Sequence, residues 1–290
     1  MRHRFFLVVV FFLFFALAAN NSPAWDPSGD RDEGALGDDG TVEESFDNAV
    51  EDDNISDIEI YINVAARKLF LYNKGELVKV YSVAVGQAVY PTPSGKYPIR
   101  FFVHNPDWTP PKSAWAANES YRGPGPGNPT GDGKLYLLSP SVHVHGTPTI
   151  NSIGRFASHG CIRMLNVDVI DLLKYLFDHV EHGKPSPYTD LSNEEYFAMA
   201  SSHPYQKFTT QVIEKVYVNT YYKLAEVIDD QLMIYMNGYG IGNRFSQAVE
   251  ALEAAEVDTG KIDLDFLAQT IKNNKDDLVI DIDMLNVQRS

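Results

Sequence analysis

The clearest pattern in the chain is an alternation of apolar and polar residues that begins at residue 58. Residues 58–64 place Ile or Val at every second position, which is typical of a strand with one buried face. Similar apolar runs follow, and turn-forming segments such as 73–75 (Asn-Lys-Gly) and 93–95 (Pro-Ser-Gly) separate them. Short strands with this punctuation predict a mostly antiparallel β-sheet or sandwich. We expect strands at 58–64, 69–72, 77–85, 97–103, 135–138 and 141–145.

After residue 166 the apolar period changes from that of a strand to that of a helix. Six apolar residues between positions 167 and 182 fall at helical spacing, with Asn166 as a candidate cap and Gly183 just past the end. We expect this helix to pack behind the strands that precede it. Weaker patterns then predict a helical insertion, two more strands and two more helices. We place these elements at 194–200, 212–219, 231–237, 245–255 and 266–271, respectively.

Residues 105–133 follow neither period. This stretch holds six prolines and five glycines together with Trp108, Trp115 and Tyr121. Irregular segments of this length in a compact domain tend to be lids or binding loops. A passive surface loop is the alternative, and the aromatic residues favour the binding loop.

The N-terminus has the layout of a secretory signal peptide. Arg2 and Arg4 precede an apolar run at 5–16, and Ala16-Leu17-Ala18 offers small residues at the spacing of a cleavage site. The alternative is an uncleaved anchor, but the run is shorter than the roughly 20 residues that a spanning helix needs. We therefore expect residues 1–18 to be removed. The mature protein would be exported to the periplasm or cell envelope and soluble after cleavage.

The formal net charge of −15 is concentrated in one segment. Residues 26–57 contain 13 acidic residues and only Arg31 as a basic one. A segment with so many charges and so few apolar residues cannot bury enough surface to fold, so residues 19–56 are predicted to be a disordered acidic linker. No basic patch suited to nucleic acid is visible in the chain.

The chain contains a single cysteine, Cys161, which cannot form a disulfide within the chain. A lone cysteine is often just a small buried apolar residue. Here His159 lies two positions away and His145 sixteen positions away. A neighbouring histidine can take the thiol proton or stabilise the thiolate, so this context favours a nucleophile.

These residues also carry a resemblance to a known family. The segment 158–164 (Ser-His-Gly-Cys-Ile-Arg-Met), with residues 145–157 before it, resembles the signature of the L,D-transpeptidase (YkuD) family of peptidoglycan-modifying cysteine enzymes. Residues 81–95 and 125–131 resemble two upstream motifs of the family, with Thr130 in place of a leucine. Twelve residues separate His145 from Ser158, and Ile-Arg-Met follows the cysteine; both features resemble one branch of the family.

The resemblance covers about residues 57–180 and implies a fold. We expect a mostly β protein, an L,D-transpeptidase-like β-sandwich with flanking helices and a small α+β C-terminal extension. The catalytic domain would span 57–238, with an insertion at about 184–210, and the extension would span 239–290. No family motif covers the extension, which is either a packing appendage or a partner-binding module.

For the mechanism we expect acyl transfer through a thioester. Cys161 would be the nucleophile and His145 the general base, with the carbonyl of Gly146 holding the imidazole in the required tautomer. The paired histidines leave open a zinc site made by His143, His145, His159 and Cys161, although thiol chemistry already explains this pattern. We expect no metal and no cofactor.

Four further residues complete the predicted site. The backbone N–H groups of Gly160 and Cys161 are candidate donors to the oxyanion, and His159 would shape that pocket. Ser158 and Arg163 are predicted to bind substrate, Arg163 through a carboxylate. A structural salt bridge is the alternative role for Arg163.

By resemblance, the substrates are peptidoglycan tetrapeptide stems. The acceptor stays open: another diaminopimelate, a lipoprotein lysine, a free D-amino acid, or water. The alternatives to a transpeptidase are an L,D-carboxypeptidase or other cysteine peptidase on the same scaffold, or a non-catalytic cell-wall-binding protein.

Overall fold

The computed structural model describes residues 55–139, 142–183, 191–203 and 205–286. The predicted signal peptide and almost all of the predicted linker lie outside the described residues. The last two linker positions already belong to strand β1 (Ile55–Asn63). Among the described residues, no helix combines the length and apolar character needed to cross a bilayer.

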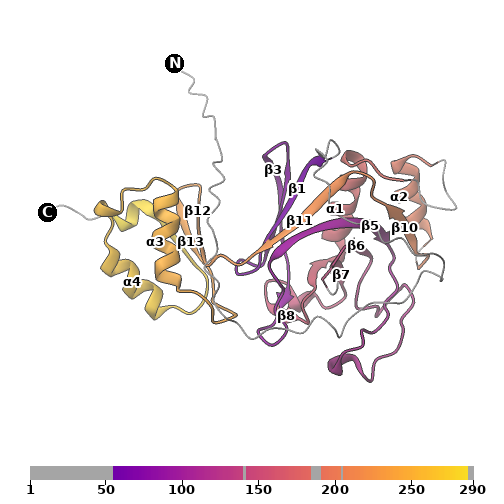
Figure 1. Ribbon diagram of the computed structural model, residues 1–290, viewed down its shortest axis with the longest axis horizontal. Coiled ribbons are helices and arrows are strands. Elements are labelled where there is room, and N and C mark those ends of the chain that lie inside the picture. Colours follow the sequence, from indigo (N-terminus) through magenta and orange to yellow (C-terminus); the bar gives the residue numbers. More distant parts are fainter. Residues whose placement is uncertain (1–54, 140–141, 184–190, 204, 287–290) are drawn as a thin grey trace, which may run out of the picture.

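Nine strands form one large sheet, which confirms the mostly β prediction (Figure 1). The order is β3-β2-β1-β11-β5-β6-β7-β9, with β10 also paired to β5. The pairs β1–β11 and β7–β9 are parallel and the other pairs are antiparallel. The strands of this sheet are β1, β2 (Lys68–Asn73), β3 (Glu76–Ser82), β5 (Gly95–His104), β6 (Gly133–Leu137), β7 (Val144–Thr147), β9 (Ile162–Leu165), β10 (Phe208–Gln211) and β11 (Lys215–Tyr221).

The alternating pattern of β1 produces the expected burial. Ile58, Ile60 and Ile62 face the core and are at most 3% exposed, whereas Glu59 and Tyr61 face outwards. The long strand predicted at 77–85 is divided in the structure. Residues up to Ser82 form β3, and Val85–Gly86 form β4, which pairs in parallel with the short strand β8 (Phe156–Ser158).

Helix α1 (Asn166–His179) packs against β6, β7 and β9, as predicted. The capping role assigned to Asn166 is wrong, because Leu165 holds the cap position and Asn166 is already the first helical residue. The Asn166 side chain instead accepts a hydrogen bond from the backbone N–H of Asp132 at 3.2 Å. The expected insertion contains α2 (Asn193–Ser202), which packs against α1, and residues 184–190 lie outside the described part.

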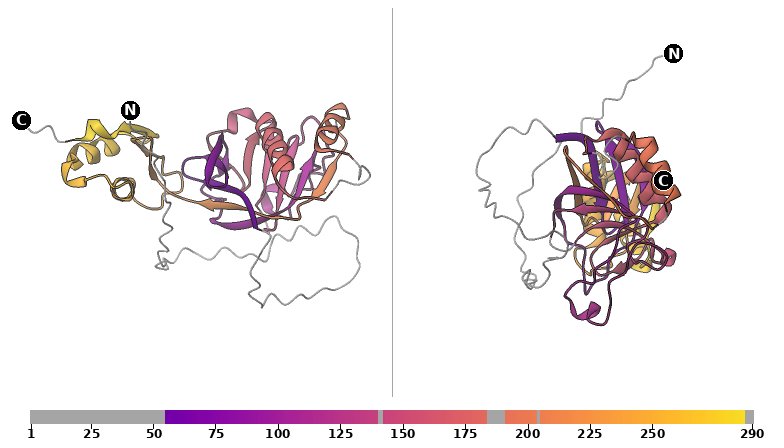
Figure 2. Two further views of the ribbon diagram at one scale, coloured as in Figure 1. Left: turned by 90° about the horizontal axis from the view of Figure 1, so that it is seen from above. Right: turned by 90° about the vertical axis from the view of Figure 1, so that its right-hand side faces the viewer.

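The C-terminal residues form a second unit with its own core. Strands β12 (Ala225–Ile228), β13 (Gln231–Ile234) and β14 (Leu278–Asp281) form a three-stranded antiparallel sheet. Helices α3 (Arg244–Ala254) and α4 (Leu264–Asn273) complete this unit. Figures 1 and 2 show it at one end of the molecule, beside the large sheet. We call residues 225–285 the C-terminal unit; its first strand begins earlier than the predicted position 239.

Several short elements were not predicted because they are too short to show a clear apolar period. Strands β8, β9, β10, β12 and β14 have only three or four residues each, too few to show a period of two. Short 3₁₀ helices were also not predicted. They lie at Ala114–Ala116, Ile150–Ser152, Thr259–Lys261 and Ile282–Leu285.

Candidate active site

Cys161 lies in the bend that joins β8 to β9, and its side chain is partly exposed. Strand β9 runs parallel to β7, in a register that pairs His145 with Arg163. Residues paired across two strands, and residues two apart along one strand, present their side chains on the same face. The register therefore places His145 and Arg163 on one face of the sheet, and Cys161 comes directly before β9.

His145 is buried and its tautomer is set by a backbone carbonyl. Its Nδ1 lies 2.6 Å from the carbonyl oxygen of Gly146, so Nδ1 carries the proton and Nε2 keeps a free lone pair. Burial lowers the pKa of His145 to about 3, although the bond to Gly146 opposes the shift. The imidazole is therefore neutral near pH 7, which is the form that can accept a thiol proton.

His143 has a different environment from His145. Its Nδ1 accepts the backbone N–H of Leu137 at 3.3 Å, and its ring stacks on Tyr136 with centroids 4.5 Å apart. Burial lowers the pKa of His143 well below its ordinary value. These contacts commit His143 to packing. Across the described parts of the chain, His, Cys, Asp and Glu side chains form no group that could hold a metal ion.

His159 lies between two aromatic side chains from different loops. The Trp115 ring stacks on it at 4.0 Å with an interplanar angle of 6°, and the Tyr90 ring lies 4.9 Å away. Partial burial lowers the pKa of His159, and the charge of Arg163 lowers it further. The segment 105–133, predicted to be a binding loop, thus reaches the site through Trp115. The contact of Tyr90 was not predicted.

The bend that carries Cys161 is held by Ser158. The Ser158 hydroxyl donates to the carbonyl oxygen of Cys161 at 2.5 Å and accepts the N–H of Gly160 at 3.1 Å. Ser158 is only 1% exposed, so its hydroxyl serves the bend and is poorly placed to touch a substrate. The Gly160 N–H, one of the two predicted donors to an oxyanion, is likewise engaged by this hydroxyl.

Arg163 supplies positive charge next to the thiol. Burial lowers the pKa of Arg163, while Cys161 acts in the opposite direction because a thiolate would favour the charged guanidinium. Its Nη1 donates only a long bond, 3.5 Å, to the carbonyl of Ala157. It forms no ion pair with an Asp or Glu in the part of the chain that the structure describes. A guanidinium in this setting is suited to a carboxylate from outside the chain.

The motif at 125–131 connects the long loop to the strand that carries His145. Asn128 is buried, and its side-chain amide donates to the carbonyls of Pro106 and Gly123 at 2.9 Å each. Gly131 has φ +63°, and a Cβ there would lie 2.6 Å from the carbonyl carbon of Gly146. Only glycine allows the loop to lie this close to the strand that holds His145.

Part of the chain matches a known protein family. Residues 57–187 match the model of the YkuD family, the L,D-transpeptidase catalytic domain. We call the unit that contains this stretch the L,D-transpeptidase domain, after the family model that it matches. YkuD of Bacillus licheniformis, named as an L,D-transpeptidase, is 35% identical over 113 residues, 39% of this chain and 56% of the relative. YbiS of Escherichia coli K12, named likewise, is 32% identical over 140 residues, 45% of this chain and 44% of the relative.

The match to these relatives is partial. The chain spans about half the length of these two curated relatives. Among solved structures, an L,D-transpeptidase from Mycobacterium smegmatis is 19% identical with a TM-score of 0.34, and the match covers 41% of this chain and 54% of that one. The family match ends at residue 187, whereas the large sheet continues through β11.

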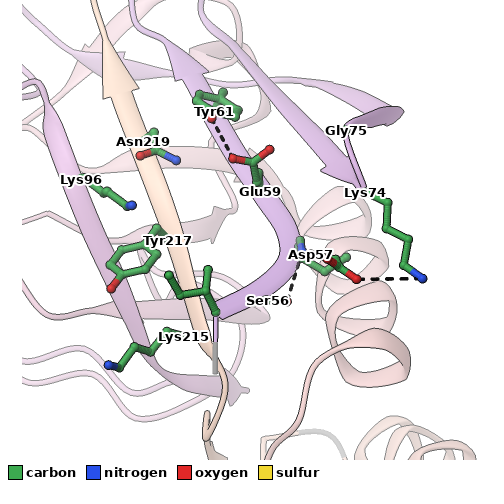
Figure 3. Close-up of a pocket in the computed structure, with 12 residues that line it drawn as sticks. Ser56, Asp57, Glu59, Tyr61, Lys74, Gly75, Lys96, Lys215, Tyr217 and Asn219 are labelled. Atoms are coloured by element: carbon green, nitrogen blue, oxygen red, sulfur yellow. Dashed lines mark hydrogen bonds and ion pairs between the residues drawn. The ribbon is translucent and has the colours of Figure 1, made fainter. Parts of the chain in front are cut away.

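A separate groove of about 310 Å³ lies on the outer face of the sheet (Figure 3). Residues of β1, β5 and β11 line it, including Glu59, Lys96 and Tyr217. The ammonium group of Lys96 lies 4.1 Å from the centre of the Tyr217 ring. None of the predicted site residues lines this groove.

Proposed function

We propose that this protein is an L,D-transpeptidase that acts on peptidoglycan tetrapeptide stems through a thioester on Cys161. The observation that carries the proposal is the buried, neutral His145, which Gly146 orients on β7, next to the strand that directly follows the only cysteine. The family match at 57–187 supplies the substrate class.

The reaction proceeds in two halves. Nε2 of His145 takes the thiol proton while Sγ of Cys161 attacks the carbonyl carbon of the bond between diaminopimelate and the terminal D-alanine. The tetrahedral intermediate collapses, the C–N bond breaks, and the imidazolium gives its proton to the departing amine of D-alanine. An acceptor amine then loses a proton to His145, attacks the thioester and releases the thiol.

The Cys161 N–H would stabilise the oxyanion, because it lies on the residue that carries the nucleophile. Arg163 would bind a carboxylate of the stem peptide. The ring of His159, held by Trp115 and Tyr90, would form one wall of the pocket.

The N-terminal pattern supports export, so the protein would act in the periplasm or cell envelope, where its substrate is found. Crosslinking of a second diaminopimelate, attachment of a lipoprotein lysine and exchange of a D-amino acid all use the same thioester. The acceptor amine alone distinguishes them, and hydrolysis by water would make the protein an L,D-carboxypeptidase.

Intact-mass spectrometry with purified disaccharide-tetrapeptide tests the proposal. We expect an adduct on Cys161 that has lost D-alanine, and its transfer to an added diaminopimelate-containing acceptor. Imipenem should also acylate the same thiol. Release of tripeptide that is indifferent to any acceptor amine would identify a carboxypeptidase. The absence of every adduct on folded protein would contradict the proposal.

A further inference from the structure

A residue of the C-terminal unit reaches the active-site bend. After β13 the chain leaves its own sheet, and Tyr239 packs against the core of the L,D-transpeptidase domain. Its ring stacks on Tyr222 with centroids 5.0 Å apart and lies 5.3 Å from Phe156, the first residue of β8. A Cβ on the neighbouring Gly238 would lie 2.3 Å from the Phe156 ring, so glycine is needed for this approach. Both rings fix the position of the Tyr239 hydroxyl.

That hydroxyl closes the loop between β4 and β5. It donates to the carbonyl oxygen of Gly86 at 2.9 Å and accepts the backbone N–H of Thr92 at 2.9 Å. The two ends of the segment 86–92 are thus joined through one oxygen atom. Tyr90, which lies against His159, belongs to the same segment.

Thr92 connects the Tyr239 hydroxyl to Gly160, the residue before the proposed nucleophile. It is 3% exposed, and its Oγ1 accepts the N–H of Gly86 at 2.8 Å and donates to the carbonyl oxygen of Gly160 at 2.7 Å. The carbonyl of Gly160 and the N–H of Cys161 belong to one planar peptide unit and point in opposite directions. Holding that carbonyl on Thr92 therefore fixes the direction of the Cys161 N–H.

Gly160 makes this control necessary. Its φ of +112° lies in a region that glycine adopts freely, so the peptide unit after it can rotate at little steric cost. The bond from Thr92 to the Gly160 carbonyl opposes rotation of this peptide unit.

We propose that Tyr239 is a positioning residue for catalysis. Through Thr92 it aims the Cys161 N–H at the oxyanion, so that the C-terminal unit completes a site whose reacting groups all lie in the other domain. This inference rests on the proposed function. It adds a residue outside the family match and assigns a role to a part of the chain that carries no family motif.

The test uses Tyr239→Phe, which removes the hydroxyl and keeps the ring contacts. The oxyanion forms only during acyl transfer, so kcat and kcat/KM with disaccharide-tetrapeptide should fall together, by about 10-fold to 100-fold, with KM unchanged. Alkylation of Cys161 by iodoacetamide needs no oxyanion donor and should stay within about twofold of the wild-type rate. A merely structural role would alter both reactions.

Two further comparisons make the result specific. Thr92→Val should lower kcat about as much as Tyr239→Phe does, whereas Thr92→Ser, which keeps the hydroxyl, should retain most of the wild-type kcat. The double variant Thr92→Val/Tyr239→Phe should lose little more kcat than either single variant. Tyr235→Phe is the matched control, because the Tyr235 hydroxyl bonds to Glu226 inside the C-terminal unit. Hydrogen exchange of the Thr92 amide should accelerate in Tyr239→Phe and not in Tyr235→Phe.

These experiments distinguish the positioning role of Tyr239 from the proposed function of the protein. If Cys161→Ala abolishes transfer while Tyr239→Phe keeps a wild-type kcat, the positioning role is wrong and the proposed function stands. If exchange of the Thr92 amide is the same in Tyr239→Phe and in wild type, the hydrogen-bond relay does not exist in solution. If wild-type protein shows no acylation that depends on Cys161, the proposed function is wrong and the positioning role falls with it.

Discussion

The L,D-transpeptidase domain and the C-terminal unit are built by the same packing rules but differ in what they bury. The core of the first domain is interrupted by buried His143, His145 and Ser158. The buried cluster of the C-terminal unit is entirely apolar, and no histidine or cysteine occurs after residue 203. Burying polar groups costs free energy unless each finds a partner, so these buried side chains in or next to β7 and β8 support the site that we propose around Cys161.

The comparison also shows how the second unit can matter without chemistry of its own. Its contacts with the first domain include the Arg67–Asp277 ion pair and the two hydrogen bonds of the Tyr239 hydroxyl. Arg67 is buried and its guanidinium lies 5.1 Å from the centre of the Phe156 ring. These contacts converge on β8 and the loop after β4, the two segments that flank Cys161.

The strongest test of this division is Cys161→Ala. If all chemistry lies in the L,D-transpeptidase domain, this substitution should reduce transfer to background while circular dichroism and the melting temperature stay close to wild type. The side chain is partly exposed, so its loss leaves no large cavity. Cys161→Ser should be nearly as inactive, because a hydroxyl is much harder to deprotonate. Residual transfer within tenfold of wild type would contradict the nucleophile assignment.

The next largest effect should separate the two histidines that flank the thiol. His145→Ala should lower turnover by about 10²-fold to 10⁴-fold and also slow alkylation of Cys161. His159 lies against Trp115 and Tyr90 without a fixed bond to Gly146, so His159→Ala should reduce turnover more than alkylation. The pH dependence of iodoacetamide labelling measures the difference. If His159→Ala shifts the labelling pKa and His145→Ala does not, His159 is the base and His145 is not.

Burial of His145 predicts how stability and turnover should depend on pH. Its pKa of about 3 lies below the ordinary value of 6.5, so folded protein keeps the neutral imidazole while unfolded protein takes up a proton between these values. Stability should be full above pH 6.5 and fall as the pH drops towards 3. Turnover should likewise persist below pH 6.5, the point where an exposed histidine base would already fail. An acid limb of kcat/KM centred at 6.5 would contradict the neutral buried base.

Trp115→Ala should have a smaller effect. The ring stack on His159 is worth about 0.5–1.5 kcal/mol, which corresponds to a change of roughly 2-fold to 13-fold in an equilibrium. We expect turnover to fall within this range, with alkylation of Cys161 unchanged or faster because the pocket is more open. Trp108→Ala is the matched control, since Trp108 pairs with Arg122 within the same loop. Equal effects of the two substitutions would show that the loop acts as a whole, without a specific contact at His159.

The sequence predicted the L,D-transpeptidase domain much better than the C-terminal unit, for physical reasons. Strands such as 58–64 have one buried face, so their alternation is visible in a single sequence. Two glycines of the motifs, Gly86 and Gly131, leave no room for a Cβ, which makes the family resemblance more specific. The carbonyl oxygen of Gly146 lies 2.6 Å from Nδ1 of His145, which is the contact that its proposed orienting role requires.

What the sequence did not reveal depends on pairing between distant segments. The contact of Tyr239 with Thr92 spans 147 positions and is made by two residues with no unusual local pattern. The boundary at 239 missed β12 and β13 because their partner, β14, begins at residue 278, and short strands cannot be assigned to a sheet before the sheet is known. The engagement of Ser158 and of the Gly160 N–H also follows only from the folded bend.

The smallest expected effect on activity tests whether the two units fold separately. Leu172 in α1 and Leu267 in α4 are each 0% exposed, so replacement by Ala should cost about 2–5 kcal/mol in either place. Among the described residues, the clustered core of the L,D-transpeptidase domain holds 30 buried residues and that of the C-terminal unit 11, so we expect the smaller unit to melt first. Leu267→Ala should lower only that first calorimetric transition and leave turnover at 25 °C within about twofold of wild type. Turnover should then fall as the first transition is crossed, because Tyr239 is released while Cys161 and His145 are still in place. Leu172→Ala should lower the second transition instead. A single transition that both substitutions lower equally would show that the two cores unfold as one cooperative unit. The two regions would then differ in their catalytic groups but not in their unfolding.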